Sequence, residues 1–304
     1  MRNLSWFNKI MFFFNIVLAL LTFVAYVLPF LAPKIFPFLS VLTLFLPMML
    51  ILNVIYFLYW GIQLKRQILL PALVLLMGIT FINKFYKFSG KNLPKEISDF
   101  TVLSYNVRLF NKFEWSEKET VPVEISDFVK ENNPDIVCIQ EFSQAKQFDY
   151  ERYRYKYIIS KGDKIKTGQA ILSKFKIIDR GEIVLPGSHN NVIFADIKKG
   201  KDTIRVYSIH LQSIKITPDV NEINDDINDM DKKKSQRIFK RMGAAFKEQQ
   251  LQAEMIMQHK SECKYPIIIC GDMNNSAFSY VYRIIRGDMQ DSFEEAGNGF
   301  GKTY

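Results

Sequence analysis

Hydrophobic positions follow two different patterns along the chain, and the change comes near residue 90. The first part contains two long uncharged runs, Ile10–Ala32 with 23 residues and Ile35–Gln63. About 20 apolar residues in a helix are enough to cross the roughly 30 Å hydrocarbon core of a bilayer. The pattern therefore predicts transmembrane helices over about residues 10–32 and 37–60.

A third hydrophobic run, Ile68–Ile82, has 15 residues, fewer than the about 17 that a span normally needs. Arg66 and Lys84 flank this run and can extend their charged ends to the membrane interface, so a third span over about residues 68–83 is also expected. A cleaved signal peptide is the alternative for the first run, but its apolar stretch is too long and no small-residue cleavage site follows. Residues 1–90 are thus interpreted as a membrane module.

Charge is distributed as unevenly as hydrophobicity. Residues 1–98 hold nine Lys or Arg and one acid, Glu96, whereas residues 99–304 hold 31 bases against 30 acids. The basic character belongs to the membrane-proximal part, so it does not indicate nucleic-acid binding by the rest. Counts of basic residues on the two sides of the spans nearly tie, four against five. With three spans, the charges that flank the first one favour an integral membrane protein whose remaining part is extracytoplasmic.

After a linker over residues 91–98, short apolar runs alternate with polar or helical stretches. Six runs of up to seven residues, rich in Val, Ile and Tyr, predict strands: Thr101–Tyr105, Ile136–Gln140, Gln169–Ser173, Val192–Ile197, Thr203–Ile209 and Pro266–Cys270. Two amphipathic stretches, Val121–Asn132 and Ser235–His259, predict helices. The layout predicts an α+β domain with mixed sheets over residues 99–304.

Polar side chains stand at the ends of four of these strands. Asn106, Glu141 and His210 each close an apolar run, and Asp272 and Asn274 follow a fourth. Strand ends are rigid and reach solvent, which suits groups whose positions must be closely fixed. Carboxylate and amide oxygens suit Mg²⁺, which keeps several waters and takes one or two protein carboxylates. Each residue alone is an ordinary turn or cap residue, so the prediction depends on their combination.

Taken together and in order, these segments resemble the endonuclease/exonuclease/phosphatase superfamily, whose members include deoxyribonuclease-like enzymes, abasic-site endonucleases, sphingomyelinases and inositol-polyphosphate phosphatases. The matching stretches are YNVR (105–108), PDIVCIQE (134–141), TGQAILSKFKI (167–177), YSIHLQS (207–213), CGDMNNS (270–276) and DSF (291–293). The resemblance covers residues 99–304. It implies a four-layer α/β/β/α sandwich of two mixed β-sheets flanked by helices, preceded here by two to three transmembrane helices. It also implies hydrolysis of phosphodiester bonds with Mg²⁺, or with Mn²⁺ as a substitute.

The resemblance implies a role for each of the residues at the strand ends. Glu141 would be the principal carboxylate ligand of Mg²⁺, with Asn106 beside it. Asp272 would orient or deprotonate the attacking water, and Asn274 would hold a non-bridging phosphate oxygen. His210 would contact the phosphate or protonate the leaving group. These roles match the needs of phosphodiester hydrolysis, which are a positioned water, a base, and positive charge on the developing oxyanion.

Two further residues, Arg108 and Asp291, are expected to support the site, although Asp291 is at least as well suited to capping a helix. The family pattern continues after a pair such as Thr303-Tyr304 with two central strands and a Ser-Asp-His motif. That aspartate and histidine complete the metal site and the base. Because the sequence stops at Tyr304, we expect a C-terminally incomplete domain with little or no hydrolytic activity as written.

The resemblance fixes the type of reaction and leaves the substrate open. Attachment to a bilayer raises the local concentration of a lipid or headgroup phosphodiester, and a membrane-attached nuclease fits equally well. The expected partners are the lipid bilayer and a phosphodiester substrate, nucleic acid or lipid headgroup, and no protein partner is predicted. A non-catalytic, membrane-tethered binding module with the same fold is the alternative. A transporter is disfavoured because the spans carry no charge.

Overall fold

The chain folds into two compact units, each made of segments that are distant in sequence. The computed structural model describes residues 4–91, 94, 96–162, 166–188, 190–214 and 232–301. The helical unit comprises Met1–Pro94, Ile214–Leu251 and Asn275–Tyr304, and the sheet unit comprises Lys95–Ser213 and Gln252–Asn274.

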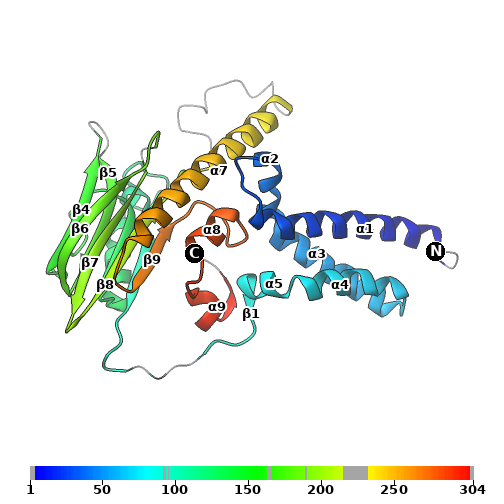
Figure 1. Cartoon of the computed structure of the whole chain (residues 1–304), viewed down its shortest axis with the longest axis horizontal. Coiled ribbons are helices and arrows are strands. Elements are labelled where there is room, and N and C mark those ends of the chain that lie inside the picture. Colours follow the sequence, from blue (N-terminus) through cyan, green and yellow to red (C-terminus); the bar gives the residue numbers. More distant parts are fainter. Residues whose placement is uncertain are drawn as a thin grey trace. The chain divides into compact units, whose positions relative to one another are not determined.

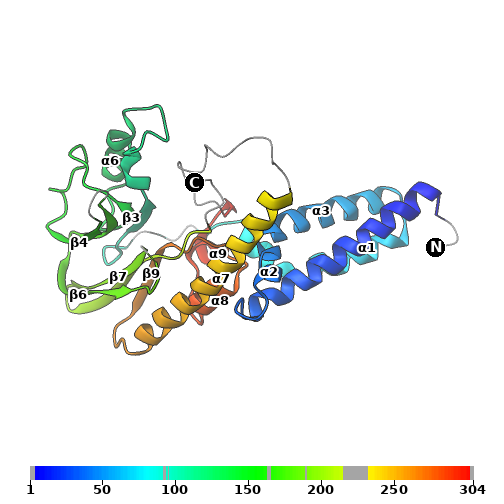
Figure 2. The ribbon, with the colours of Figure 1, turned by 90° about the horizontal axis from the view of Figure 1, so that it is seen from above.

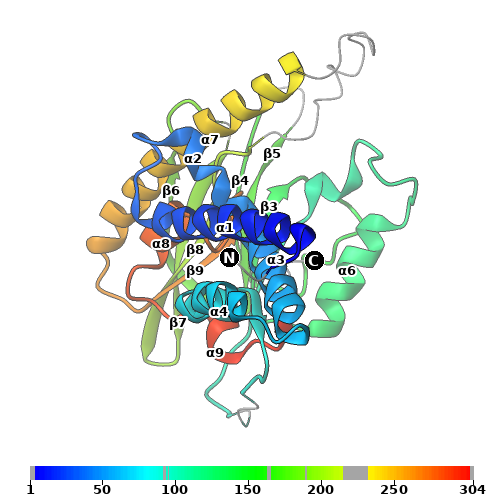
Figure 3. The ribbon, with the colours of Figure 1, turned by 90° about the vertical axis from the view of Figure 1, so that its right-hand side faces the viewer.

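Long apolar helices form the first part of the helical unit and lie side by side (Figures 1 and 3). The elements are α1 (Trp6–Val27), η1 (Leu28–Phe30), α2 (Pro37–Ser40), α3 (Leu42–Ile62), η2 (Arg66–Ile68), α4 (Leu69–Met77) and α5 (Ile79–Phe85). Two helical stretches, Trp6–Phe30 and Leu42–Ile62, are long and apolar enough to cross a membrane. A third span is present if the bent pair of Arg66–Met77 and Ile79–Phe85 is counted as one.

The two predicted long helices are confirmed, with shifted bounds. α1 begins early because the Ser5 hydroxyl accepts a hydrogen bond from the Asn8 N–H at 3.3 Å, and it tightens into a 3₁₀ turn where Pro29 follows. The third stretch is not straight, because it bends by 66° between α4 and α5. At the bend, Gly78 leaves room for Tyr26, whose hydroxyl donates to the Val74 carbonyl at 3.0 Å; a Cβ on Gly78 would collide with that hydroxyl.

Polar side chains join α1 to α3 across their packed faces. Asn15 accepts from the indole N–H of Trp60 at 3.1 Å, and Asn53 donates to the Thr22 hydroxyl at 3.1 Å. These four side chains are fully buried. Buried polar groups without a partner are costly in an apolar medium, so the contacts favour one alignment of the two helices.

The rest of the helical unit is built from later parts of the chain. It contains α8 (Tyr280–Arg286), α9 (Ser292–Ala296), the Lys232–Leu251 part of α7 (Lys232–Ser261) and a short antiparallel pair of β1 (Tyr86–Lys87) with β10 (Gly299–Phe300). Phe278 packs into the apolar cluster of α1, α3 and α4. Arg283 donates to the Pro29 carbonyl at 2.7 Å. The segment after residue 274 is therefore anchored on the apolar helices.

Two mixed four-stranded sheets form the sheet unit (Figure 2). The first has the order β2-β3-β5-β4, from β2 (Val102–Asn106), β3 (Ile136–Phe142), β4 (Tyr155–Lys161) and β5 (Thr167–Ser173). The second has the order β6-β7-β8-β9, from β6 (Lys176–Val184), β7 (Asn191–Lys199), β8 (Asp202–His210) and β9 (Ile267–Asp272). One pair in each sheet is parallel, β2 with β3 and β8 with β9, and the other pairs are antiparallel.

The sheets pack face to face and each is covered by a helix. Ile136, Cys138 and Ile171 of the first sheet meet Ile193 and Val206 of the second in one buried cluster. The opposite face of the first sheet packs on η3 (Arg108–Asn111) and α6 (Val121–Asn132). The end of α7 covers the second sheet, where the His259 ring lies 4.7 Å from that of Phe194. The mixed α/β architecture with two mixed sheets that the resemblance implied is confirmed.

The predicted elements of this unit are all present, but two strands were missed. The six predicted strands correspond to β2, β3, β5, β7, β8 and β9, and the helix Val121–Asn132 is α6, which ends at Asn133 in a left-handed conformation before Pro134. β4 and β6 were not predicted. Charged residues interrupt both strands, which read YKYIISK and KIIDRGEIV, so they lack the continuous apolar run that predicts a strand.

Candidate functional site

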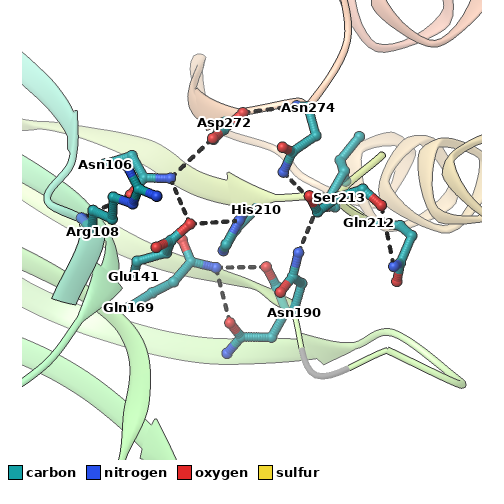
Figure 4. Close-up of polar contacts among 12 residues, drawn as sticks. Asn106, Arg108, Glu141, Gln169, Asn190, His210, Gln212, Ser213, Asp272 and Asn274 are labelled. Carbon is teal, nitrogen blue, oxygen red and sulfur yellow. Dashed lines mark hydrogen bonds and ion pairs between the residues drawn. The ribbon is translucent and has the colours of Figure 1, made fainter. Parts of the chain in front are cut away.

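Asn106, Glu141, His210 and Asp272 come from four strands and meet at one end of the two sheets (Figure 4). The parallel register sets Asn106 opposite Gln140 in the first sheet and His210 opposite Asp272 in the second. The side-chain NH₂ of Asn106 donates to Glu141 Oε1 at 3.1 Å and to Asp272 Oδ2 at 3.0 Å. One amide thus links a carboxylate from each sheet.

A β-bulge aims Glu141 toward this site. The register of β3 against β5 shifts between Ile139 and Phe142, and Glu141 has a positive φ of 50°. Ile139 and Phe142 both lie in the core beneath α6, whereas Gln140 between them points into the inter-sheet space, where it reaches Ser208. The extra residue lets Phe142 take the core position that strict alternation would give to Glu141.

The segment after β9 holds Asp272 in one orientation. Its Oδ1 accepts from the Asn274 N–H at 2.7 Å, while its Oδ2 accepts from Asn106. Gly271 has a φ of 132° and lies against the Ile209 carbonyl, which a Cβ would strike, so only glycine suits this place. Asn274 also donates from its side chain to the Leu211 carbonyl at 2.9 Å, and the whole turn is fixed to the end of β8.

His210 is almost fully enclosed beside the two carboxylates. It is 7% exposed, and its Nε2 lies 3.8 Å from Glu141 Oε1. Burial lowers the pKa of His210, and the negative charges of Asp272 and Glu141 oppose that effect.

Arg108 acts on the site through its backbone. Its N–H donates to Asn106 Oδ1 at 3.0 Å, which turns the NH₂ group of Asn106 toward the carboxylates. The guanidinium lies elsewhere, 4.6 Å from the ring centre of Trp115. Arg108 is thus brought to the site, with its charge stacked on an indole.

The backbone from Arg108 to Asn111 is left-handed at four consecutive residues, with φ values of 43°, 53°, 52° and 60°. This conformation costs an L-residue roughly 1–2 kcal/mol. Burial of Phe110 offsets part of that cost, because its ring is 4% exposed and packs on Phe142 and Phe148 with centroids at 6.1 and 5.5 Å. Strained backbone of this kind is often found at functional sites.

Asp291 is the N-cap of α9 in the helical unit. Its Oδ1 accepts from the Glu294 N–H at 2.9 Å, and its Oδ2 accepts from the Tyr282 hydroxyl at 2.7 Å. These contacts account for the carboxylate as a helix cap, the second interpretation that the sequence left open. Its proposed support of the site stays a prediction.

A buried chain of polar side chains beneath the site was not predicted. Gln140 donates to the Ser208 hydroxyl at 2.9 Å, Ser208 donates to Gln169 Oε1 at 2.6 Å, and Gln169 donates to Asn191 Oδ1 at 3.0 Å. All four residues are at most 6% exposed. Asn190, next to the chain, donates to the Leu211 carbonyl at 2.6 Å. The available signal was a glutamine or serine inside an otherwise apolar strand, which does not reveal its partner.

The oxygen donors at this site suit Mg²⁺ better than they suit the Zn²⁺ of a closed structural site. The Glu141 side chain is 32% exposed, so an ion that keeps its waters can reach it, and Asn106 lies beside it. Among the residues that the structure describes, no group of three or more His, Cys, Asp or Glu is placed to hold a metal. Mg²⁺ requires only one or two protein carboxylates, whereas a structural Zn²⁺ site takes four protein ligands.

Family models cover most of the chain. Residues 8–85 match a domain of unknown function, DUF8431, and residues 103–304 match the Endonuclease/Exonuclease/phosphatase family. The chain belongs to the Endonuclease/Exonuclease/phosphatase family. The match includes every residue of the candidate site and agrees with the resemblance found in the sequence. No curated protein matches the chain.

Solved structures also match, at low identity. D. rerio TDP2 complexed with single strand DNA product is 18% identical over 62% of this chain and 65% of that one, with a TM-score of 0.40. Sphingomyelinase C from Streptomyces griseocarneus is 16% identical over 62% of this chain and 69% of that one, with a TM-score of 0.44. The chain spans 64% and 65% of the length of the two D. rerio TDP2 structures that it matches. Likeness at this level says nothing about the substrate.

Proposed function

We propose that the chain is a membrane-anchored, Mg²⁺-dependent phosphoesterase that hydrolyses phosphodiester bonds in nucleic acid or in a lipid headgroup. The observation that carries the proposal is the Asn106 amide, which bonds Glu141 at 3.1 Å and Asp272 at 3.0 Å beside His210. Membership of the family supports the reaction type, because the residues that meet here are those that its pattern assigns to catalysis.

Asp272 would orient or deprotonate the attacking water. Amide N–H groups at 2.7 and 3.0 Å bond its two oxygens, and such bonds fix the direction from which the carboxylate meets a water. His210 would contact the phosphate or protonate the leaving group, and Asn274 would hold a non-bridging oxygen. All three project from strand ends or the tight turn after β9, which keeps their mutual positions constant during the reaction.

Glu141 would hold Mg²⁺, or Mn²⁺ in its place, and Asn106 would join it with Oδ1 after its amide turns away from the Arg108 N–H that this oxygen now accepts from. When bound, the ion supplies positive charge that stabilises the charge developing on the phosphate oxygens. The bulge at Glu141 matters here, since it releases the carboxylate from the core face of β3.

A hydrolysis panel tests the proposal. The full chain in neutral detergent would be given DNA, RNA, sphingomyelin and inositol phosphates, with Mg²⁺ or with a chelator. Glu141→Gln and Asp272→Asn should each lower the rate by at least about 10²-fold, while Glu131→Gln on the exposed face of α6 should leave it unchanged. Activity that survives both site variants would contradict the assignment. Substrate binding without turnover would favour the non-catalytic binding module.

Membrane anchoring is supported by the length and apolar character of Trp6–Phe30 and Leu42–Ile62. We propose that they cross the bilayer, that α4 and α5 form a third, bent span, and that the remaining part is extracytoplasmic. Protease treatment of sealed vesicles of known orientation tests this arrangement. Cleavage of the sheet unit only from the extracytoplasmic side is expected, and cleavage only from the other side would overturn the orientation.

A further inference from the structure

A groove opens where α3 ends and η2 and α4 begin. It is open to the outside, has a volume of about 350 Å³, and is lined by Trp60, Leu64, Lys65, Arg66, Ile68 and Leu69. That volume lies within the about 300–1,000 Å³ of small-molecule sites. The start of α1 lies at the same end of the helices (Figure 1), where Asn8 donates to Gln63 at 2.8 Å. The groove therefore lies at one end of the proposed spans, where they would meet the membrane–water interface.

Leu64 occupies a place in this groove that normally favours glycine. It follows the C-cap of α3 with a φ of 49°, and the Lys65 N–H closes the helix end by donating to the Trp60 carbonyl at 3.0 Å. Glycine is the usual residue in such a left-handed cap. Leu64 is also 93% exposed. A leucine here costs backbone strain in any surroundings, and its exposed apolar surface is a further cost unless apolar molecules cover it.

Positive charge at the groove has no acidic partner among the residues that the structure describes. The sequence contains no Asp or Glu before Glu96. Within the part of the chain that the structure describes, neither Lys65 nor Arg66 forms an ion pair. Two adjacent cations beside an apolar surface match an amphiphile with a negative head and an apolar tail. Basic residues that flank a span attract anionic lipid headgroups by the same physics.

We propose that this groove binds an anionic phospholipid, with the headgroup phosphate on Lys65 and Arg66 and an acyl chain against Leu64, Ile68 and Leu69. The inference rests on the proposed insertion into a bilayer and does not depend on the proposed hydrolysis. A zwitterionic phospholipid offers the same acyl chains, but its own ammonium group offsets the phosphate charge. Net charge therefore decides which lipid the groove prefers.

Thermal unfolding with added lipid tests the site. The full chain would first be floated with vesicles to confirm insertion, then purified in neutral detergent. Phosphatidylglycerol should raise the unfolding midpoint of the helical unit by a few degrees, and phosphatidylcholine with the same chains should not. If the chain does not float with the vesicles, it does not insert into a bilayer and the lipid-binding proposal is overturned. The hydrolysis panel is independent of this result, because it is run in detergent.

Three variants separate a built site from general attraction between charges. Lys65→Gln/Arg66→Gln should abolish the shift with phosphatidylglycerol. Lys34→Gln/Lys87→Gln, which removes the same charge outside the groove, should keep it. Leu64→Gly should unfold no earlier than the parent without lipid, since it relieves strain, yet show a smaller shift. The proposal is overturned by an equal shift with phosphatidylcholine, by no shift in the parent, or by loss of the shift in the control pair.

Discussion

Ser208→Ala removes one hydroxyl from the buried polar chain and should destabilise the sheet unit far more than its size suggests. Ser208 is fully buried; its hydroxyl accepts from Gln140 Nε2 at 2.9 Å and donates to Gln169 Oε1 at 2.6 Å. The change therefore leaves buried polar atoms on two neighbouring strands with fewer partners than they need.

The size of the effect follows from those atoms. The Gln169 oxygen loses its donor, and an unsatisfied buried group costs about 1–3 kcal/mol. Gln140 keeps a weaker bond to the Cys138 carbonyl at 3.3 Å, so its loss is smaller. The sum is about 2–4 kcal/mol, which for a domain of this size lowers the unfolding midpoint by about 4–16 °C.

The assay is thermal unfolding of the full chain in detergent, followed by the sheet signal in circular dichroism. Ser160→Ala, on an exposed part of edge strand β4, is the matched control and should change stability by less than about 0.5 kcal/mol. If Ser208→Ala unfolds at the same temperature as Ser160→Ala, the hydroxyl is not holding the two sheets together and the reasoning fails.

Three other predictions concern stability. Arg205→Met should cost about 3–5 kcal/mol, because it leaves Asp196, 2% exposed and bonded at 2.6 Å, without its cation; the double change Asp196→Leu/Arg205→Met should recover most of this loss in the same unfolding assay. Asp291→Ala should lower the stability of the helical unit by about 1 kcal/mol through loss of the α9 cap and leave hydrolysis unchanged, so a large fall in rate at normal stability would favour its predicted support of the site instead. Asn53→Leu should stay within about 1 kcal/mol of the parent in detergent, since its lost bonds to the Thr22 hydroxyl and to the Met49 carbonyl of its own helix are offset by removal of a carbonyl oxygen that has no partner among the described residues; a much larger loss would contradict this balance.

Elements whose start and stop signals both lie in the neighbouring sequence could be predicted. The helix Val121–Asn132 has Pro122 in its first turn and Asn133-Pro134 after its last residue, and its observed bounds agree. The six predicted strands, with β2 and β9 at the edges of the described sheets among them, were found because each is a short run rich in Val, Ile and Tyr. The 66° bend after α4 was not predicted, and the contact of Tyr26 with Gly78 at the bend joins residues 52 positions apart in the chain, which no local pattern contains.

The sequence predicts which residues form the candidate site, but not the hydrogen bonds that join them. Asn106, Glu141 and Asp272 stand out as polar residues at the ends of apolar runs. Their bonding through one amide depends on the register of two parallel strand pairs in different sheets, which no local pattern contains. Arg108 was expected to support the site, and its backbone N–H, not its guanidinium, contacts Asn106.

The left-handed turn from Arg108 to Asn111 has a consequence for chemical synthesis of this protein. D-amino acids favour the mirror-image half of backbone space, so their preferred helical φ is the one that these four L-residues adopt. A ligated chain with D-residues there would have an unstrained backbone where the ribosomal product is strained, and glycine is the nearest substitute that a gene can encode. The choice between L- and D-residues at positions 108–111 therefore decides whether the turn that follows Asn106 is strained or relaxed, independently of side-chain polarity and size.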